Sequence, residues 1–359
     1  MDDLLRDKKF EVLIQSRPES TEDWNNSVSS FTQGTFFQTT YWGDYLFRYK
    51  NCEPYYISCK KDNLPIGQCL MWKEWVKISG LRCFPRLFCS YGPLLIEYNK
   101  ENIDKFLEVI DNICDRDKII SLEKLTVTLH TGSFALNENI NNHLLISKNH
   151  SYYKWATILL DLSKKDDELW EGISYSAKKC LKRNEKEKIE VVIAHTNDDF
   201  DEYYKLLSSF MEKNRNKMPY FTPAIWRFFQ KDNKCMQIFL AKHNGIVHGG
   251  LSILYFNGII FEIGACRSEY AIKHNLFVGD AIKWEVIRWA NKQGFRLYDL
   301  SGVSPVISSE KERGIRKFKE KWGGEPIDYY IYSKIYRRNA YFLYNIIKKI
   351  YKLKSKLKI

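Results

Sequence analysis

Hydrophobic and polar residues in the first half of the chain follow patterns that predict alternating strands and helices. The pattern predicts strands at Phe10–Gln15, Tyr55–Lys60, Ile66–Trp72, Leu81–Ser90 and Lys124–His130. The second and third of these flank a polar turn, which predicts a hairpin. Helices are expected at Thr40–Tyr49 and at Asn102–Cys114.

The second half of the chain repeats this order of elements. The pattern there predicts a helix through Trp226–Phe229, strands Gln237–Lys242, Ile246–Tyr255 and Ile259–Cys266, a helix Leu276–Lys292 that stops at Gly294, and a strand Phe295–Leu300. We interpret the halves as two diverged copies of one α/β unit, although any two mixed domains can share such an order. The first domain is expected at 1–150, with the boundary in the polar stretch Asn137–Ser151, and the second at 151–333.

A basic segment lies between the two predicted copies. Apolar residues recur at helical spacing through Asp166–Arg183, and three of its cations are candidates for contact with RNA or another phosphate: Lys178, Lys182 and Arg183. The alternative is a helix face that is simply solvated.

Positive charge is concentrated at the C-terminus. The chain of 359 residues has a formal net charge of +12, and residues 334–359 carry nine basic residues and no acidic one. The body is therefore only mildly basic, which argues against a uniformly basic nucleic-acid-binding protein. Apolar residues at helical spacing predict that 334–359 is a basic amphipathic helix, which can bind an anionic membrane, contact tRNA phosphates, or dock on the body.

Composition narrows the class of protein further. A hydrophobic content of 44% with 15% aromatic residues is typical of a globular chain with sizeable cores. The nine cysteines show no CxxC spacing and do not cluster with the histidines, so no metal site or disulfide framework is predicted. The charged N-terminus and the lack of a long apolar run indicate a cytoplasmic protein.

Four segments carry the most specific sequence signal. The first is YDLSGV at 298–303, followed by GIRKFKEKWGGE at 314–325. The others are FFQTTYWGDYL at 36–46, CSYGPLL at 89–95, and LWEGISYSAKKCLKRNEKEKIEV at 169–191. Together these segments resemble the Fem family of aminoacyl-tRNA-dependent transferases that build peptidoglycan cross-bridges. The resemblance implies an α/β fold of two tandem GNAT-like acyltransferase domains with mixed central sheets. No long heptad run is present, so the chain resembles the members that lack a coiled-coil arm.

The resemblance also implies an activity. The donor would be aminoacyl-tRNA, and the acceptor would be an amine on a nucleotide- or lipid-linked cell-wall precursor of peptidoglycan or pseudopeptidoglycan type. Its lipid-linked form allows peripheral contact with the inner face of the membrane. An ester donor is already activated, so catalysis needs positioning, removal of a proton and oxyanion stabilisation, with no cofactor. The sequence agrees, because it has no recognisable nucleophile motif.

The family motifs place the candidate site residues. Lys319 would supply a fixed ammonium, and Asp299 would accept the amine's proton, or else bond the turn at Ser301-Gly302. The remaining candidates are substrate-binding residues: Arg215, Lys217, Tyr220, Phe318, Trp322, Gly323, Tyr91 and Phe261. Phe318 and Trp322 could instead pack so as to orient Lys319, and Gly323 could serve a tight turn.

Two departures from the family pattern keep other functions open. Tyr45 and Leu46 stand where relatives often place a phosphate-binding lysine, and Phe261 stands where a tyrosine is often found. One alternative is therefore an acyl-CoA-dependent N-acyltransferase acting on an amino sugar or surface polysaccharide precursor, although the glycine pattern that cradles pyrophosphate is missing from 267–279. The other is a non-catalytic RNA- or membrane-binding protein on a degenerate transferase fold.

Overall fold

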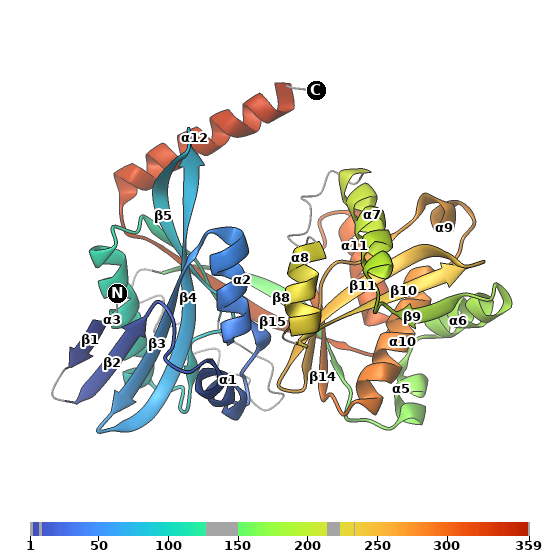
Figure 1. Ribbon diagram of the computed structural model, residues 1–359, viewed down its shortest axis with the longest axis horizontal. Helices are drawn as coiled ribbons and strands as arrows, with labels where there is room; N and C mark the ends of the chain where they lie inside the picture. The colour runs from blue at the N-terminus through green and yellow to red at the C-terminus, as the bar shows by residue number, and fades with distance from the viewer. Residues whose placement is uncertain (1–2, 7–8, 127–149, 214–222, 233, 358–359) are drawn as a thin grey trace. The chain divides into compact units, whose positions relative to one another are not determined.

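The computed structural model describes residues 3–6, 9–126, 150–213, 223–232 and 234–357 (Figure 1). The chain divides into two compact units. The first unit joins the two ends of the chain, Met1–Lys154 and Tyr329–Ile359, and the second unit is Trp155–Asp328. Residues 137–149 of the expected domain boundary lie outside the described residues.

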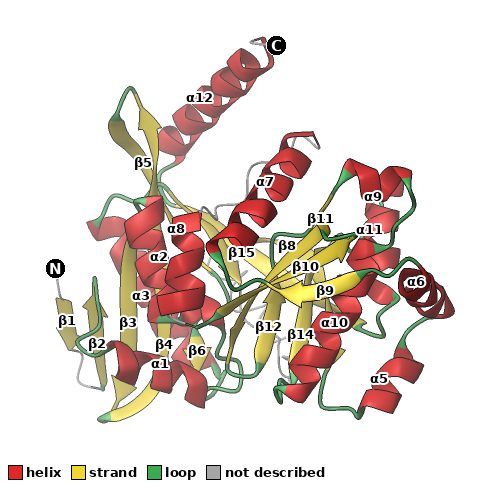
Figure 2. Ribbon diagram, turned by 45° about the vertical axis from the view of Figure 1, so that its right-hand side comes forward, coloured by secondary structure: helices red, strands yellow, loops and turns green. Residues whose placement is uncertain are grey.

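The first unit is a mixed sheet with helices (Figures 1 and 2). Its strands lie in the order β1-β2-β3-β4-β5-β7-β15, and β5 and β7 pair in parallel. The strands are β1 (Asp3–Arg6), β2 (Phe10–Gln15), β3 (Glu53–Lys61), β4 (Leu64–Ile78), β5 (Leu81–Cys89), β6 (Leu94–Leu95), β7 (Ser121–Thr126) and β15 (Glu325–Ile335). The helices are α1 (Thr21–Ser30), η1 (Phe36–Gln38), α2 (Thr40–Lys50), α3 (Lys100–Arg116) and α12 (Arg338–Leu357).

The second unit has the same kind of sheet. Its strands lie in the order β8-β14-β12-β11-β10-β9, and β12 and β14 pair in parallel. The strands are β8 (Ser151–Asp161), β9 (Glu190–Ile193), β10 (Met236–His243), β11 (Ile246–Phe256), β12 (Ile259–Glu262), β13 (Cys266–Arg267) and β14 (Leu297–Val303). The helices are α5 (Asp166–Gly172), α6 (Tyr175–Lys186), α7 (Asn197–Lys213), α8 (Pro223–Trp226), η2 (Arg227–Asp232), α9 (Glu269–Lys273), α10 (Val278–Lys292) and α11 (Glu310–Glu320).

The predicted repeat corresponds to one shared topology. In the first unit three antiparallel strands, β3-β4-β5, lead through α3 to β7, which lies parallel to β5. In the second unit β10-β11-β12 lead through α10 to β14, which lies parallel to β12. A parallel pair needs a crossover connection, and each unit supplies it with an amphipathic helix. The predicted α/β fold class is confirmed.

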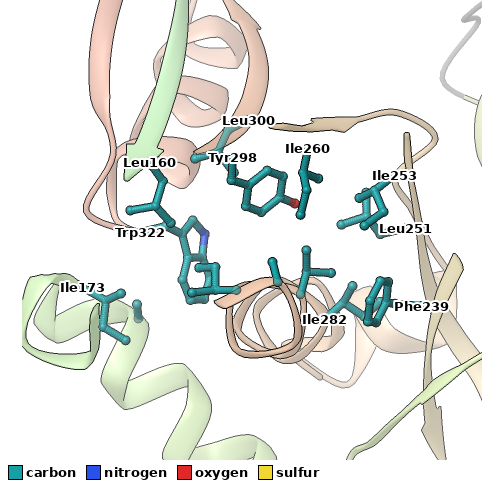
Figure 3. Close-up of a cluster of buried hydrophobic side chains, with 14 of the residues drawn as sticks. Leu160, Ile173, Phe239, Leu251, Ile253, Ile260, Ile282, Tyr298, Leu300 and Trp322 are labelled. Carbon is teal, nitrogen blue, oxygen red and sulfur yellow. The ribbon is translucent and has the colours of Figure 1, made fainter. Parts of the chain in front are cut away.

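Each crossover helix buries one apolar face against its own sheet. In α3 this face includes Ile103, Phe106, Leu107 and Ile110, at the spacing that predicted the helix. In α10 it includes Val278, Ile282, Val286 and Ile287. Figure 3 shows side chains from β8, β10, β11, β12 and β14 meeting α10 residues in the core of the second unit. Burial of these faces fixes the helices against the sheets.

Three sequence predictions need correction. The strand expected at 259–266 breaks after Glu262, because Gly264 adopts a positive φ of 44° and accepts a hydrogen bond from the Tyr203 hydroxyl. The helical stretch 166–183 forms two helices, since the Ser174 hydroxyl caps a new one by accepting from Ala177 N–H at 3.2 Å. The helix expected at Trp226–Phe229 divides into α8 and the π-helical turn η2.

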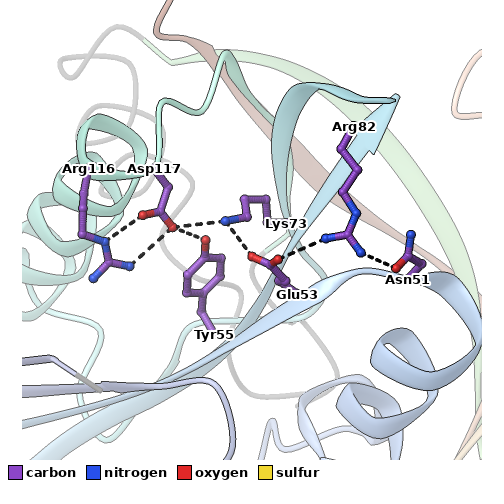
Figure 4. Close-up of polar contacts among 7 residues, drawn as sticks. All are labelled: Asn51, Glu53, Tyr55, Lys73, Arg82, Arg116 and Asp117. Carbon is purple, nitrogen blue, oxygen red and sulfur yellow. Dashed lines mark hydrogen bonds and ion pairs between the residues drawn. The ribbon is translucent and has the colours of Figure 1, made fainter. Parts of the chain in front are cut away.

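A polar network ties the strands of the first unit together at one end of α3 (Figure 4). The Lys73 ammonium on β4 lies 2.7 Å from a Glu53 oxygen and 3.5 Å from an Asp117 oxygen. Burial alone would raise the pKa of Asp117, but hydrogen bonds from Arg116 and Tyr55 lower it overall. The network therefore links α3 to β3 and β4 through charge-assisted bonds.

One glutamine bridges a break in strand pairing of the first unit. Gln38 is fully buried, and its side-chain oxygen accepts from Leu70 N–H at 2.7 Å. Its Nε2 donates to Leu70 O at 3.2 Å and to Ser90 O at 2.7 Å. This amide satisfies backbone groups at the point where β4 pairs with neither β5 nor β6.

Among the described residues, no helix is long and apolar enough to cross a membrane.

We expect Gln38→Leu to lower the free energy of unfolding by about 3 kcal/mol, because it leaves several buried backbone groups without partners. Gln33→Leu is the matched control: Gln33 is only partly buried and bonds a single backbone group, Leu95 O at 3.0 Å, so its loss should be about 1 kcal/mol. Urea denaturation followed by tryptophan fluorescence measures both. Equal losses for the two variants would contradict the bridging role.

Candidate functional site

The candidate site lies in the second unit, where β12 and β14 stop pairing. Their parallel register runs from Ile259 opposite Leu297 to Phe261 opposite Asp299. On its other side β14 pairs with β8, and that register shifts between Asp299 and Gly302. Ser301 in this bulge has a φ of 66°. The carboxyl ends of parallel strands, and bulges beside them, are where α/β proteins commonly bind ligands.

Lys319 reaches this bulge from α11. Its ammonium donates to Ser301 O at 2.9 Å and to Gly302 O at 3.0 Å. The start of α11 is fixed by Ser309, whose hydroxyl accepts from Glu312 N–H at 3.3 Å. Burial lowers the pKa of Lys319, which Glu262 and Asp299 partly offset. The predicted lysine is therefore a desolvated cation held at one point of the backbone.

The buried side chain of Asp299 also bonds this turn. Its side chain is 1% exposed, and its Oδ1 accepts from Ser301 N–H at 2.8 Å and from the Thr157 hydroxyl. This is the turn-bonding role that the sequence offered as the alternative to proton transfer. The Ser301 hydroxyl donates to Glu262 O at 2.5 Å and so links β14 to the end of β12.

A buried ion pair lies beside the parting strands. Lys283 on α10 is 2% exposed and forms an ion pair with Glu262 at the end of β12. Its ammonium also lies 3.1 Å from the Tyr298 hydroxyl on β14. Burial lowers the pKa of Lys283, and the Glu262 carboxylate opposes that shift. These three side chains join α10 to both parallel strands.

A second cation, Lys321, lies at the N-terminal end of α10. It forms an ion pair with the buried Asp280 in the first turn of that helix. Its ammonium is 4.5 Å from the centre of the Phe318 ring, within cation–π distance. The Phe318 ring in turn lies near the backbone of Gly279. Phe318 therefore packs over the first turn of α10.

Trp322 and the glycines after it form a close contact with the end of α5. Trp322 is 1% exposed and belongs to the core cluster of the second unit (Figure 3). Gly323 has a φ of 82°, and a Cβ there would meet Gly172 O at 2.9 Å. Ser174 N–H donates to Lys321 O at 2.8 Å across the same contact. The fold itself thus requires Trp322 and Gly323, whether or not a substrate reaches them.

Two further predicted residues lie at strand ends. Phe261 is buried on β12, directly opposite Asp299. Tyr91 follows β5 in the first unit, with a φ of 57°, and its N–H donates to the Thr126 hydroxyl at 2.8 Å. The Tyr91 ring stacks on Phe37 with the ring centres 5.0 Å apart.

The three cations of the predicted phosphate contact all lie on α6. Lys178 forms an ion pair with Glu171 at 2.9 Å, and Lys182 is exposed. The Arg183 guanidinium lies 5.4 Å from the Phe277 ring at the start of α10, next to Asn184, which donates to Phe277 O at 2.8 Å. Arg183 is therefore placed at the N-terminal end of α10. Arg215, Lys217 and Tyr220 lie outside the described residues.

The sequence analysis missed two buried ion pairs near the site, Lys283–Glu262 and Lys321–Asp280. The four residues come from three separate segments, and no short motif joins them. A signal was nevertheless present: acidic and basic residues interrupt otherwise apolar positions of a predicted strand and a predicted helix, which indicates paired burial.

The side chains at this site can position a substrate and polarise its carbonyl group, whereas the nearby cysteine is poorly suited to act as a nucleophile. The Cys266 thiol is buried, and burial raises its pKa to about 12, so it is protonated near neutral pH and a poor nucleophile. Within the ranges that the structure describes, no cluster of His, Cys, Asp and Glu could hold a metal ion. The arrangement instead offers a fixed ammonium at a strand gap, which can stabilise negative charge on an oxygen.

Comparison with known proteins supports the fold. No family model and no curated protein sequence matches the chain. Among solved structures, FemX superposes with a TM-score of 0.71 at 14% identity, covering 91% of this chain and 98% of FemX. A tandem GNAT protein from the clavulanic acid biosynthesis pathway gives 0.56 at 11% identity, covering 91% and 98% of the two chains. L-PGS from Bacillus licheniformis gives 0.50 at 15%, covering 74% and 81%. The chain has a Fem-like tandem GNAT fold, as its motifs implied.

Proposed function

We propose that the protein is an aminoacyltransferase that moves an amino acid from aminoacyl-tRNA to an amine of a cell-wall precursor. The amine nitrogen would attack the ester carbonyl, the bond to the tRNA oxygen would break, and the amine's proton would leave while that oxygen gains one. No cofactor is needed, because the donor ester supplies the driving force. The cell-wall acceptor rests on the resemblance of the motifs to the Fem family, and FemX has a similar fold.

The observation that carries this proposal is the placement of Lys319. Two of the three ammonium protons bond the Ser301 and Gly302 carbonyls, and no other hydrogen-bond partner of Lys319 lies in the described ranges. The third proton can therefore face a substrate oxygen. An ammonium held by two carbonyls needs little reorganisation when negative charge develops on that oxygen, which is how such groups accelerate acyl transfer.

Asp299 fits a positioning role in this scheme. Its Oδ1 holds Ser301 N–H at 2.8 Å, and the carbonyl of the same Ser301 holds Lys319. Its 1% exposure makes direct contact with an amine substrate difficult. We therefore propose that Asp299 fixes the geometry of the bulge. The proton of the attacking amine would pass to solvent or to another group of the acceptor.

The buried Lys283–Glu262 pair lies beside the point where β12 and β14 stop pairing. An ion pair at this depth gains little net stability over apolar residues, but breaking one partner leaves an uncompensated charge. The pair therefore fixes α10 against β12 and β14 in one arrangement. Glu262 also lies close enough to Lys319 to favour its charged form.

The start of α10 favours aminoacyl-tRNA over acyl-CoA. The positive end of a helix is where acyl-CoA enzymes of this fold hold pyrophosphate. Here the Asp280 carboxylate already occupies the first turn and pairs with Lys321. Arg183 and Lys182 on α6 are the cations we assign to tRNA phosphates, with Lys178 beside them.

The acyl-CoA-dependent alternative rests on one residue and one structure. Phe261 puts a ring without a hydroxyl opposite Asp299, so a standard precursor would lose a hydrogen bond there. The structure of the tandem GNAT protein of similar fold is described as one without AcCoA, which names that compound as its expected ligand. The non-catalytic alternative requires that no transfer depends on Lys319.

The donor is tested by incubating the protein with radiolabelled aminoacyl-tRNA and a nucleotide-linked precursor. We expect label in the precursor, and we expect RNase treatment of the tRNA beforehand to abolish it. Acyl-CoA alone should give no product, and saturating CoA should not raise the melting temperature. Transfer from acyl-CoA, or a clear CoA-induced shift, would establish the alternative donor.

Lys319→Met should lower kcat/KM for transfer by about a hundredfold or more, because it removes the charge that faces the reacting oxygen. Lys317→Met is the matched control: it removes an exposed lysine from the same helix and should leave kcat/KM within about twofold. Equal effects of the two substitutions would contradict the role of Lys319.

The pH dependence of transfer tests whether the reaction needs the positive charge of residue 319. Because burial lowers the pKa of Lys319, its ammonium should be lost, and transfer should fall, at a lower pH than for an exposed lysine. In Lys319→Arg the guanidinium stays protonated, so any remaining activity should not show that alkaline fall. An unchanged alkaline limb in this variant would assign the titration to another group.

Glu262→Met should reduce the free energy of unfolding by about 3 to 5 kcal/mol, because Lys283 is left buried without its carboxylate. The double variant Glu262→Met, Lys283→Met should lose less than the single one. Glu285→Met on the same helix breaks an exposed pair with Arg288 and should cost under about 1 kcal/mol. Chemical denaturation measures all three, and additive losses in the double variant would show that the pair is not coupled.

A further inference from the structure

Helix α12 is docked on the first unit through the face that carries Tyr344. Tyr344 is buried, and the Arg86 guanidinium on β5 donates to its hydroxyl at 2.8 Å. The same guanidinium lies 5.0 Å from the centre of the Tyr344 ring, and Phe84 lies 6.0 Å from it. The strand before α12 is tied down as well, since Lys334 bonds both Asp111 oxygens at 2.8 and 2.9 Å. The helix is therefore held at its beginning, beside β5.

The face away from Tyr344 is apolar and exposed. Phe342 is 68% exposed, and Leu343, Ile346 and Ile350 are exposed as well. At 3.6 residues per turn these four residues form one stripe, and Tyr344 lies off it. In the sequence the same spacing continues with Leu353 and Leu357. Figure 1 shows α12 leaving the sheet beside β5 and continuing past it.

Cations accompany this stripe. Arg338 and Lys349 are exposed and fall next to Phe342 when the helix is viewed along its axis. The last 26 residues contain nine basic residues and no acidic one, and of these Lys334 and Arg337 face Asp111 and Asp115. Among the side chains that the structure describes, Arg338, Lys348 and Lys349 form no ion pair. An apolar stripe bordered by lysine is the pattern of a helix that lies in a membrane interface.

We propose that α12 binds the surface of an anionic lipid bilayer, with Phe342, Leu343, Ile346 and Ile350 entering the headgroup region and Arg338 and Lys349 facing lipid phosphates. This goes beyond the transfer reaction and does not depend on it. RNA would use the lysines but would leave the apolar stripe exposed to water. A second copy of α12 would bring two strongly cationic helices together, which repel each other.

The proposal is tested by co-sedimentation of the full chain with vesicles. Vesicles of phosphatidylcholine with phosphatidylglycerol should bind the protein, and phosphatidylcholine alone should bind it much more weakly. Raising the salt from about 0.1 M to about 1 M should weaken binding, because the screening length falls from about 10 Å to about 3 Å. The triple variant Phe342→Ser, Ile346→Ser, Ile350→Ser should lose about tenfold or more of the partition coefficient.

Phe47→Ser is the matched control, because Phe47 on α2 is 62% exposed, similar to Phe342. It should leave vesicle binding unchanged. Lys319→Met should also bind vesicles normally, which separates this proposal from the proposed function. Three outcomes would overturn the proposal: equal loss in Phe47→Ser, binding of tRNA rather than vesicles that depends on the stripe, and a dimer at working concentration that the triple variant dissolves.

Discussion

The bulge in β14 is the constraint on which the rest of the second unit depends. Parallel pairing of β12 and β14 stops at Phe261 and Asp299, and the backbone beyond must satisfy its polar groups in another way. Asp299 accepts from Ser301 N–H, the Ser301 hydroxyl donates to Glu262 O, and Lys319 donates to the Ser301 and Gly302 carbonyls. Side-chain bonds thus replace the backbone ladder beyond this point, and a fixed cation is bonded to the bulge.

The two units compensate for breaks in strand pairing with different chemistry. Where β4 of the first unit pairs with neither β5 nor β6, the neutral amide of Gln38 replaces the missing backbone partners. In the second unit the break at the candidate site lies between β12 and β14, and the groups beside it are charged: Lys319 at the bulge, and Lys283 with Glu262. A neutral bridge can hold a shape, whereas a desolvated cation can also stabilise developing negative charge. We therefore place the chemistry in the second unit.

Much of the fold could be predicted from the sequence, because apolar spacing directly reflects the faces that helices and strands bury. The helix at Asn102–Cys114 and the hairpin around residues 61–65 were of this kind. The break after Glu262 was not, since it depends on a hydrogen bond from Tyr203, which is distant in the sequence. The motif around Lys319 identified that lysine by resemblance. Its surroundings could not be predicted, because Glu262 and the carbonyls of Ser301 and Gly302 come near Lys319 only in the folded chain.

Part of the positive charge at the C-terminus takes part in docking α12 on the first unit. Lys334 and Arg337 anchor the start of α12 through Asp111 and Asp115, so part of the excess charge serves folding. Tyr344 uses one face of the helix for docking, and the stripe of Phe342, Leu343, Ile346 and Ile350 remains exposed. The proposed transfer site and the proposed membrane contact of this helix therefore rest on different residues.

The central claim is that Lys319 faces the reacting carbonyl of the donor. A crystal structure with a stable amide analogue of the aminoacylated 3′ adenosine tests this claim most directly. We predict that the analogue's carbonyl oxygen lies about 3 Å from Lys319 Nζ, with the ammonium still bonded to Ser301 O and Gly302 O. An analogue bound with its carbonyl away from Lys319, or bound outside the opening between β12 and β14, would contradict the account.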